Sequence, residues 1–162
     1  MKKTLLPLAI LIISACASNN GIYKKSENVV NEITKKIPYP WKEINNEGSD
    51  YALSNEETHS IFLFNSSCRK FQSSSLTTLT SSILTGIEEL KVIEKNSIFT
   101  QDRNAIEIVV NGKLDGISRA FKIVTVQKNN CIYDYVLISI NTDSLNKDSK
   151  HFKTFLERIK LN

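Results

Sequence analysis

The sequence has few residues of the kinds that usually perform catalysis or hold a metal ion. Its 162 residues include only two histidines and three cysteines. A Ser-His-Asp site would have to recruit His59 or His151, and no nucleophile-elbow sequence accompanies them. The cysteines also lack the Cys-x-x-Cys spacing that indicates a zinc site. We therefore predict no catalytic residue, no metal site and no bound cofactor.

Long hydrophobic runs and a strong excess of one charge are absent as well. No run in the chain reaches the roughly 18 apolar residues that a membrane-spanning helix needs. The 21 Lys and Arg residues exceed the 17 Asp and Glu residues by too little to form the concentrated basic surface that nucleic acids require. A hydrophobic content of 41% and a charged content of 23% are typical of a globular protein. A nucleic-acid partner is not expected.

The N-terminus carries the most specific signal in the chain. Lys2 and Lys3 precede an apolar run from Leu5 to Ile13, which ends in small residues, as in a secretory signal peptide. The segment Ile13-Ser14-Ala15-Cys16 resembles the lipobox of bacterial lipoproteins. This resemblance implies diacylation of the Cys16 thiol, cleavage after Ala15, and N-acylation of the new terminus.

The same resemblance predicts a location. Two or three acyl chains hold a protein stably on a membrane, at roughly 0.8 kcal/mol per buried CH₂ group. The mature chain is therefore expected to be a soluble body tethered to the cell envelope through Cys16. Ala17 stands where an Asp would resemble an inner-membrane retention signal, so the analogy favours the outer membrane, facing the periplasm.

Removal of the signal peptide (residues 1–15) leaves 147 residues, an ordinary size for a single domain. Residues 16–25 are mostly small and polar and are predicted to form a flexible tether. Residues 26–162 are predicted to form one domain.

Once Cys16 is assigned to the lipid, Cys68 and Cys131 remain as a pair. Exported proteins meet an oxidising compartment, so a disulfide is the expected state of two such cysteines. Closing a loop of this length, some 64 residues, would stabilise the fold by roughly 4 kcal/mol on the chain-entropy model. A metal site that adds His59 or His151 is the alternative.

Hydrophobic periodicity and turn residues predict the order of the elements. Helices are expected at 27–36, 75–90 and 147–160. Strands are expected near Trp41–Ile44 and at 51–53, 58–64, 92–100, 104–114, 117–128 and 131–140. Asp115-Gly116 and Asn129-Asn130 are hairpin turn signals. The prediction is an α+β fold, with an antiparallel meander sheet of about five to seven strands flanked by helices.

Four features allow both a structural and a functional interpretation. The hydroxyl-rich face of residues 77–85 could be semi-buried or could form a contact surface. The basic helix at 147–160 could cover the core or lie on a membrane. Asp134 needs a partner if buried, and Arg103 and Lys122 are candidates. Tyr133 and Tyr135 could belong to the core or line a groove, together with Phe62 or Phe64. We favour the structural interpretation of each.

Several short motifs over residues 58–160 resemble the PsbP-like (DcrB-like) fold of small bacterial envelope lipoproteins. They are Asn65-Ser66-Ser67-Cys68, the Leu76/Leu79/Leu84-Thr85-Gly86 helix, Asp102-Arg103-Asn104-Ala105, Gly112-Lys113-Leu114-Asp115-Gly116, and Lys128-Asn129-Asn130-Cys131-Ile132-Tyr133-Asp134. The resemblance implies α/β/α layers and a small lipoprotein of the bacterial cell envelope.

The sequence therefore predicts a non-enzymatic, lipid-anchored envelope lipoprotein. It would bind a protein or an apolar ligand as an accessory of a periplasmic or outer-membrane complex. A small periplasmic hydrolase or other enzyme with an unrecognised site is the alternative.

Overall fold

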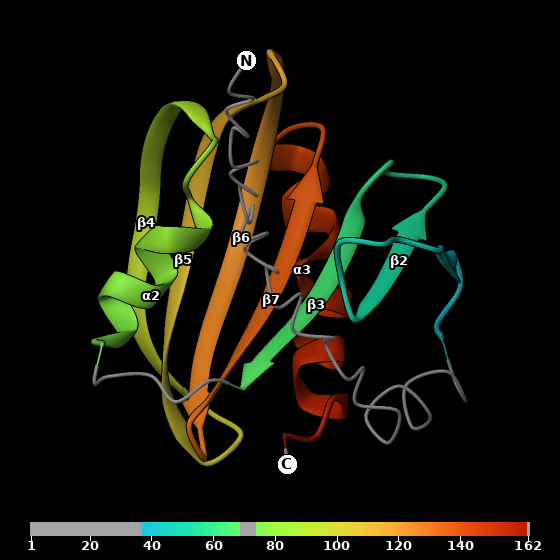
Figure 1. Ribbon diagram of the computed structural model, residues 1–162. Helices are drawn as coiled ribbons and strands as arrows, with labels where there is room; N and C mark the ends of the chain where they lie inside the picture. Colours follow the sequence, from blue (N-terminus) through green and yellow to red (C-terminus); the bar gives the residue numbers. More distant parts are fainter. Residues whose placement is uncertain (1–36, 69–73, 162) are drawn as a thin grey trace, which may run out of the picture.

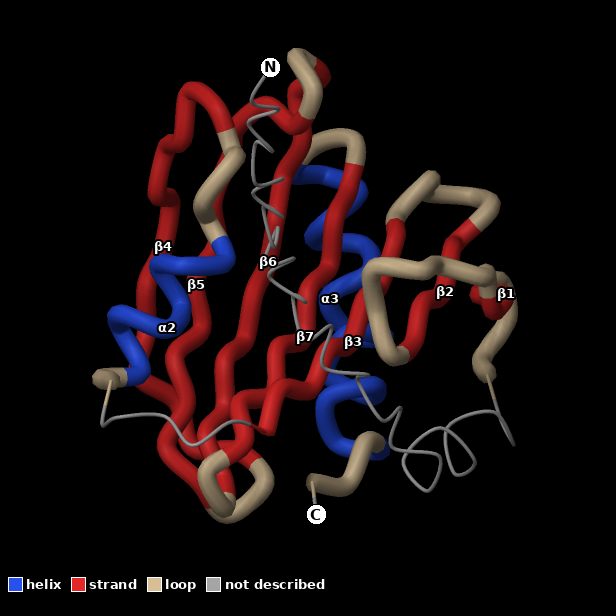
Figure 2. The backbone as a smooth tube through the Cα atoms, viewed as in Figure 1, coloured by secondary structure: helices blue, strands red, loops and turns tan. Residues whose placement is uncertain are grey.

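The computed structural model describes residues 37–68 and 74–161, which form one open antiparallel sheet of seven strands (Figures 1 and 2). The strand order is β1-β2-β3-β7-β6-β5-β4. The strands are β1 (Trp41–Glu43), β2 (Tyr51–Asn55), β3 (Ile61–Cys68), β4 (Glu88–Thr100), β5 (Arg103–Leu114), β6 (Ile117–Lys128) and β7 (Cys131–Ser139).

Two helices flank the described sheet, with α2 (Leu76–Ile83) on one face and α3 (Thr142–Arg158) on the other (Figure 1). This arrangement confirms the predicted α+β fold with α/β/α layers. The predicted signal peptide, tether and 27–36 helix lie outside the described residues. Neither of the two described helices is long and apolar enough to span a membrane.

Three two-residue turns connect β4, β5, β6 and β7 into a meander. All six turn residues have a positive φ between 51° and 74°, the left-handed backbone of a type I′ turn. Such turns match the right-handed twist of paired strands, which keeps the long hairpins in register. The turn residues are Gln101-Asp102, Asp115-Gly116 and Asn129-Asn130, and the sequence signals for the second and third turns are confirmed.

The larger hydrophobic core lies between α3 and the sheet. Phe152 and Phe155 are almost fully buried, and the rings of Phe155 and Phe62 lie 4.8 Å apart between centroids. The predicted core role of this helix is therefore confirmed. The helix begins earlier than residue 147 because the Asn141 side chain accepts a hydrogen bond from the Ser144 N–H at 2.9 Å and caps it at Thr142.

The helix on the opposite face, α2, is shorter than the predicted span of 75–90. Gly86 adopts a φ of 92°, which ends the helical path, and β4 already begins at Glu88. In the sequence, apolar residues keep a helical spacing through Ile87 and Leu90. In the structure, both residues lie beyond the end of the helix. Ile83, Leu84 and Ile87 nevertheless pack against the second, smaller core of β5, β6 and β7.

The β2–β3 connection also departs from the prediction that a strand begins at Thr58. The Asn55 side chain accepts hydrogen bonds from the backbone N–H groups of Glu57 and Thr58 at 2.9 and 3.3 Å. His59 follows with a φ of 54°. This side-chain turn delays β3 until Ile61, and β3 then lies inside the sheet between β2 and β7, as predicted.

Gly112→Ala tests how closely the α2–β4 connection approaches β5. A Cβ atom at position 112 would lie 2.3 Å from Ile87 Cγ2 and 2.9 Å from the Glu88 carbonyl oxygen. We expect the free energy of unfolding, measured by urea titration, to fall by about 1–3 kcal/mol. Gly48→Ala is the control because its Cβ would meet only the Asn46 side chain, at 3.3 Å. Equal stability of the two variants would contradict the observed packing.

Candidate functional site

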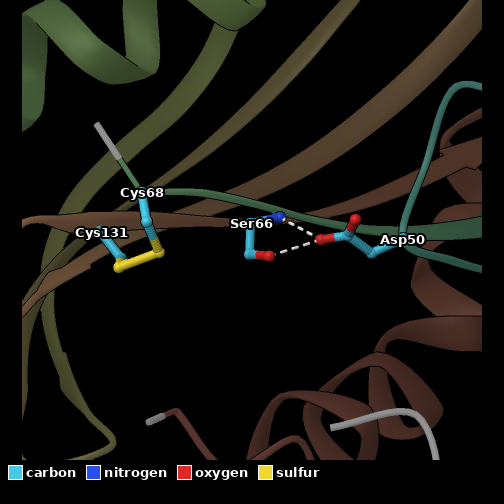
Figure 3. The surroundings of a disulfide bond; sticks show 4 residues. All are labelled: Asp50, Ser66, Cys68 and Cys131. Carbon is cyan, nitrogen blue, oxygen red and sulfur yellow. Dashed lines mark hydrogen bonds between the residues drawn. A yellow bond between two sulfur atoms is a disulfide. The ribbon is translucent and has the colours of Figure 1, made fainter. Parts of the chain in front are cut away.

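The β3–β7 pairing places Cys68 directly opposite Cys131, and the two form a disulfide (Figure 3). Their sulfur atoms lie 2.05 Å apart and their Cα atoms 4.0 Å apart. The structure confirms the predicted cysteine pair. Because both sulfurs are used, the alternative metal site on these cysteines is not formed, and no cluster of three or more His, Cys, Asp and Glu side chains occurs in residues 37–68 and 74–161.

A polar loop borders the disulfide. One carboxylate oxygen of Asp50 accepts hydrogen bonds from the backbone N–H and the hydroxyl of Ser66, at 2.6 and 2.5 Å (Figure 3). A hollow of about 610 Å³ lies beside them, lined by residues 46–50 and 65–67. The Asp50–Ser66 contact ties the start of β2 to β3, so we assign it a structural role.

The two histidines do not assemble a catalytic triad among the described residues. His151 Nδ1 accepts a hydrogen bond from the indole N–H of Trp41 at 3.1 Å. The nearest carboxylate oxygen of Asp148 lies 3.9 Å away, and both Asp148 oxygens accept other hydrogen bonds, from the Asn55 amide and the Thr58 hydroxyl. His59 is exposed on the β2–β3 connection.

Asp148 is a buried residue that the sequence reasoning missed. Its side chain joins α3 to the Asn55 turn, with hydrogen bonds of 2.9 Å and 2.5 Å. Its position in the sequence could have revealed it, because Asp148 lies four residues before Phe152 and therefore on the face of α3 that packs against the sheet. Its buried location and its two polar partners indicate a structural anchor.

Asp134 lies on the central strand β7, on the sheet face that carries α2, between Asn65 and Thr125 of the adjacent strands. Its Oδ1 atom is buried and makes no hydrogen bond. The predicted ion pair with Lys122 or Arg103 is wrong. Lys122 points to the other face, where it binds Glu107 at 3.0 Å, and Arg103 begins β5 at its exposed end. Burial raises the pKa of Asp134 to about 6.

Tyr133 and Tyr135 belong to the core, so the groove alternative is wrong. Both side chains are buried, and the Phe64 ring lies 6.3 Å from Tyr133 and 5.1 Å from Tyr135 between centroids. The Tyr135 hydroxyl donates to the Ile159 carbonyl at 3.2 Å. Tyr135 thus helps to fix the C-terminal end of α3.

The hydroxyl-rich face of α2 is more exposed than expected. Thr80 is buried, but Thr77, Thr78, Ser81 and Ser82 are exposed, so the semi-buried interpretation fails for most of the face. The Ser81 and Ser82 hydroxyls donate to carbonyls of their own helix, at 2.9 and 2.6 Å. These internal hydrogen bonds satisfy the hydroxyl donors without a ligand.

Exposed aliphatic side chains gather where β5 turns into β6. We call them the hairpin-end patch, and their exposed fractions range from 39% to 54%. Leu114 pairs with Ile117, and the next pair on the same face of the sheet, Gly112 and Arg119, lies between Leu90 and Ile140. The patch consists of Leu90, Leu114, Ile117 and Ile140. Apolar groups this exposed and this close together are typical of a binding surface.

A hollow of about 340 Å³ lies at the start of α3, at the same end of the sheet as the hairpin-end patch. Three basic side chains, Lys91, Lys113 and Arg119, line it together with Ile140. Glu89 forms an ion pair with Lys113 at 2.5 Å. The hollow therefore has a net positive lining. The strand register places Lys91 and Lys113 on the α3 face of the sheet, opposite the face that carries the hairpin-end patch and Arg119.

Loss of the disulfide should lower stability substantially. The bond closes a long loop, because its cysteines are 63 positions apart in the sequence. The chain-entropy model therefore predicts that Cys68→Ala/Cys131→Ala lowers the free energy of unfolding by about 4 kcal/mol. Urea titration followed by tryptophan fluorescence measures the change. A reducing agent should destabilise the wild type and leave the variant unaffected. A variant as stable as the oxidised wild type would contradict this prediction.

Asp134 should make the protein less stable as the pH rises. Because its pKa is about 6 in the folded protein, above the ordinary 3.8, the folded state keeps a proton that the unfolded chain releases. Stability therefore falls between about pH 4 and pH 6. Asp134→Asn should remove this component and exceed the wild type by about 2–3 kcal/mol near pH 7, with parity near pH 4. Urea titrations at both pH values measure the difference in unfolding free energy between the variant and the wild type. A difference that does not depend on pH would refute this prediction.

No protein-family model and no curated protein sequence matches the chain. Among solved structures, PA94 from Pseudomonas aeruginosa, a protein of unknown function, is similar with a TM-score of 0.57 at 7% identity, over 79% of this chain and 87% of that one. CyanoP, the PsbP of Synechocystis sp. PCC 6803, is similar with a TM-score of 0.54 at 9% identity, over 75% and 82%. At these identities the likeness shows the fold alone, and that fold is the α+β arrangement of the PsbP-like protein.

Proposed function

We propose that this protein is a lipid-anchored lipoprotein of the cell envelope that acts by binding another envelope protein. Cys16 carries the anchor, and the outer membrane, facing the periplasm, is its location. The disulfide between Cys68 and Cys131 supports export, because such bonds persist in oxidising compartments. The proposal assigns no catalytic step to the domain.

The hairpin-end patch is the observation that carries the binding role. Its four aliphatic side chains surround Arg119, whose guanidinium donates, among the described residues, only to the neighbouring Ser118 carbonyl, at 3.2 Å. A protein that presents an apolar surface with a carboxylate near its centre would fill this arrangement and pair with Arg119.

The anchor is tested by Cys16→Ser in the full chain. In the wild type, mass spectrometry should find an N-terminal Cys16 that carries acyl chains, and the protein should sediment with membranes. Cys16→Ser should lose the acyl mass and leave the membrane fraction, whereas the neighbouring Ser18→Ala should behave as wild type. An unmodified Cys16 in the wild type would contradict the anchor.

The binding surface is tested by photo-crosslinking in intact cells of the native host. A photoreactive residue at Ile117 should yield one discrete protein adduct, and Arg119→Glu should reduce its yield several-fold. The same residue at Lys153, exposed on α3, is the control and should yield no such adduct. A lipid adduct, or an adduct that Arg119→Glu leaves unchanged, would contradict a partner of the proposed chemistry.

A further inference from the structure

The strand β4 ends the sheet, and no described strand pairs with its outer edge. Its first half contains two register shifts, between Glu88 and Lys91 and between Val92 and Glu94. From Glu94 to Thr100 the pairing with β5 is regular. Bulges hinder the addition of a further strand, so only this regular stretch is suited to pair with one.

The turn after β4 determines which backbone groups face outward. Thr100 and Arg103 flank the two-residue turn and form its hydrogen-bonded pair. Counting back from Thr100, every second residue of β4 therefore forms backbone hydrogen bonds with β5. The N–H and C=O groups of Phe99, Ser97 and Lys95 consequently point away from the sheet. The free edge thus offers three evenly spaced residues, with Ser97 in the middle of the regular stretch.

The end of this edge is held in place by α3. The Gln101 side-chain amide donates hydrogen bonds to the carbonyls of Leu156 and Ile159, at 2.6 and 3.1 Å. Ile98 packs against the larger core on the same face. The outer edge is therefore fixed before any partner arrives, which lowers the entropic cost of pairing.

We propose that β4 pairs antiparallel with β4 of a second copy of this chain, about a two-fold axis at Ser97. In this register the outward groups of residues 95, 97 and 99 all find partners. Ser97 faces Ser97 of the other copy, and the two sheets join into one continuous sheet.

The side chains that face each other in this register are complementary. Lys95 of each copy lies opposite Phe99 of the other, which places an ammonium group beside the ring of a side chain that is 70% exposed in the single chain. On the other face Asn96 meets Ile98, and Glu94 meets Thr100. No two like charges face each other, so a second copy of this chain suits the edge.

A charge-exchange experiment tests the pairing in the full chain, with Cys16→Ser present in every variant to avoid acylation. Sedimentation velocity should show a reversible dimer as the concentration rises. Phe99→Lys places a lysine opposite Lys95 of the other copy and should weaken dimerisation about tenfold. Lys95→Glu/Phe99→Lys restores opposite charges and should recover it. Within one chain residues 95 and 99 lie beside Ile108 and Asn104, so the rescue reports contacts between copies.

The register is tested separately with engineered thiols. Ser97→Cys places its Cα atom roughly 5.5 Å from that of its symmetry mate, within disulfide range, so mild oxidation should yield a covalent dimer. Asn104→Cys, exposed on the neighbouring strand, is the control for random collision and should remain monomeric. Three results would overturn the proposal. The wild type could stay monomeric at the highest concentration, Phe99→Lys could dimerise with unchanged affinity, or the two thiols could crosslink equally.

Discussion

The packing of α3 against the sheet is the interaction on which the rest of this structure depends. It buries Phe152 and Phe155 against Phe62 and makes one face of the sheet the main core. Polar contacts fix the helix at several levels: Asp148 holds the β2–β3 turn, and Gln101 holds the end of the β4–β5 hairpin. The burial of large aromatic groups supplies the driving force, while these hydrogen bonds determine the position of the helix.

Because α3 covers one face so completely, the surfaces available to partners lie elsewhere. Within residues 37–68 and 74–161 the opposite face carries only the short helix α2, which reaches β5 and β6 and leaves the hairpin-end patch exposed. The outer edge of β4 likewise pairs with no strand in the part of the chain that the structure describes (Figure 1). The disulfide lies at the other end of β7 from this patch, where it joins β3 to β7. Stabilising contacts and candidate binding surfaces are therefore separated in the domain.

Local signals predicted most of the fold, and tertiary contacts explain what they missed. Turn pairs such as Asp115-Gly116 determine the conformation of a hairpin turn by themselves, so the meander could be predicted from the sequence. The length of α2 could not, because Ile87 and Leu90 keep a helical spacing after Gly86 has ended the helix. The partner of Asp134 was also predicted wrongly, since periodicity did not reveal that Lys122 binds Glu107 on the opposite face. The hairpin-end patch was missed because alternation predicts which residues share a face, but not whether that face is covered.

Hydrogen exchange on the membrane-bound and the purified protein tests the central claim, which is that the domain binds through the surface that α3 leaves uncovered. The account predicts slower amide exchange at residues 88–92 and 114–119 in native membranes than in the purified protein. Exchange in α3 and β7 should be equal in the two samples, because that core exists without a partner. Identical exchange throughout, or added protection confined to α3, would contradict the account.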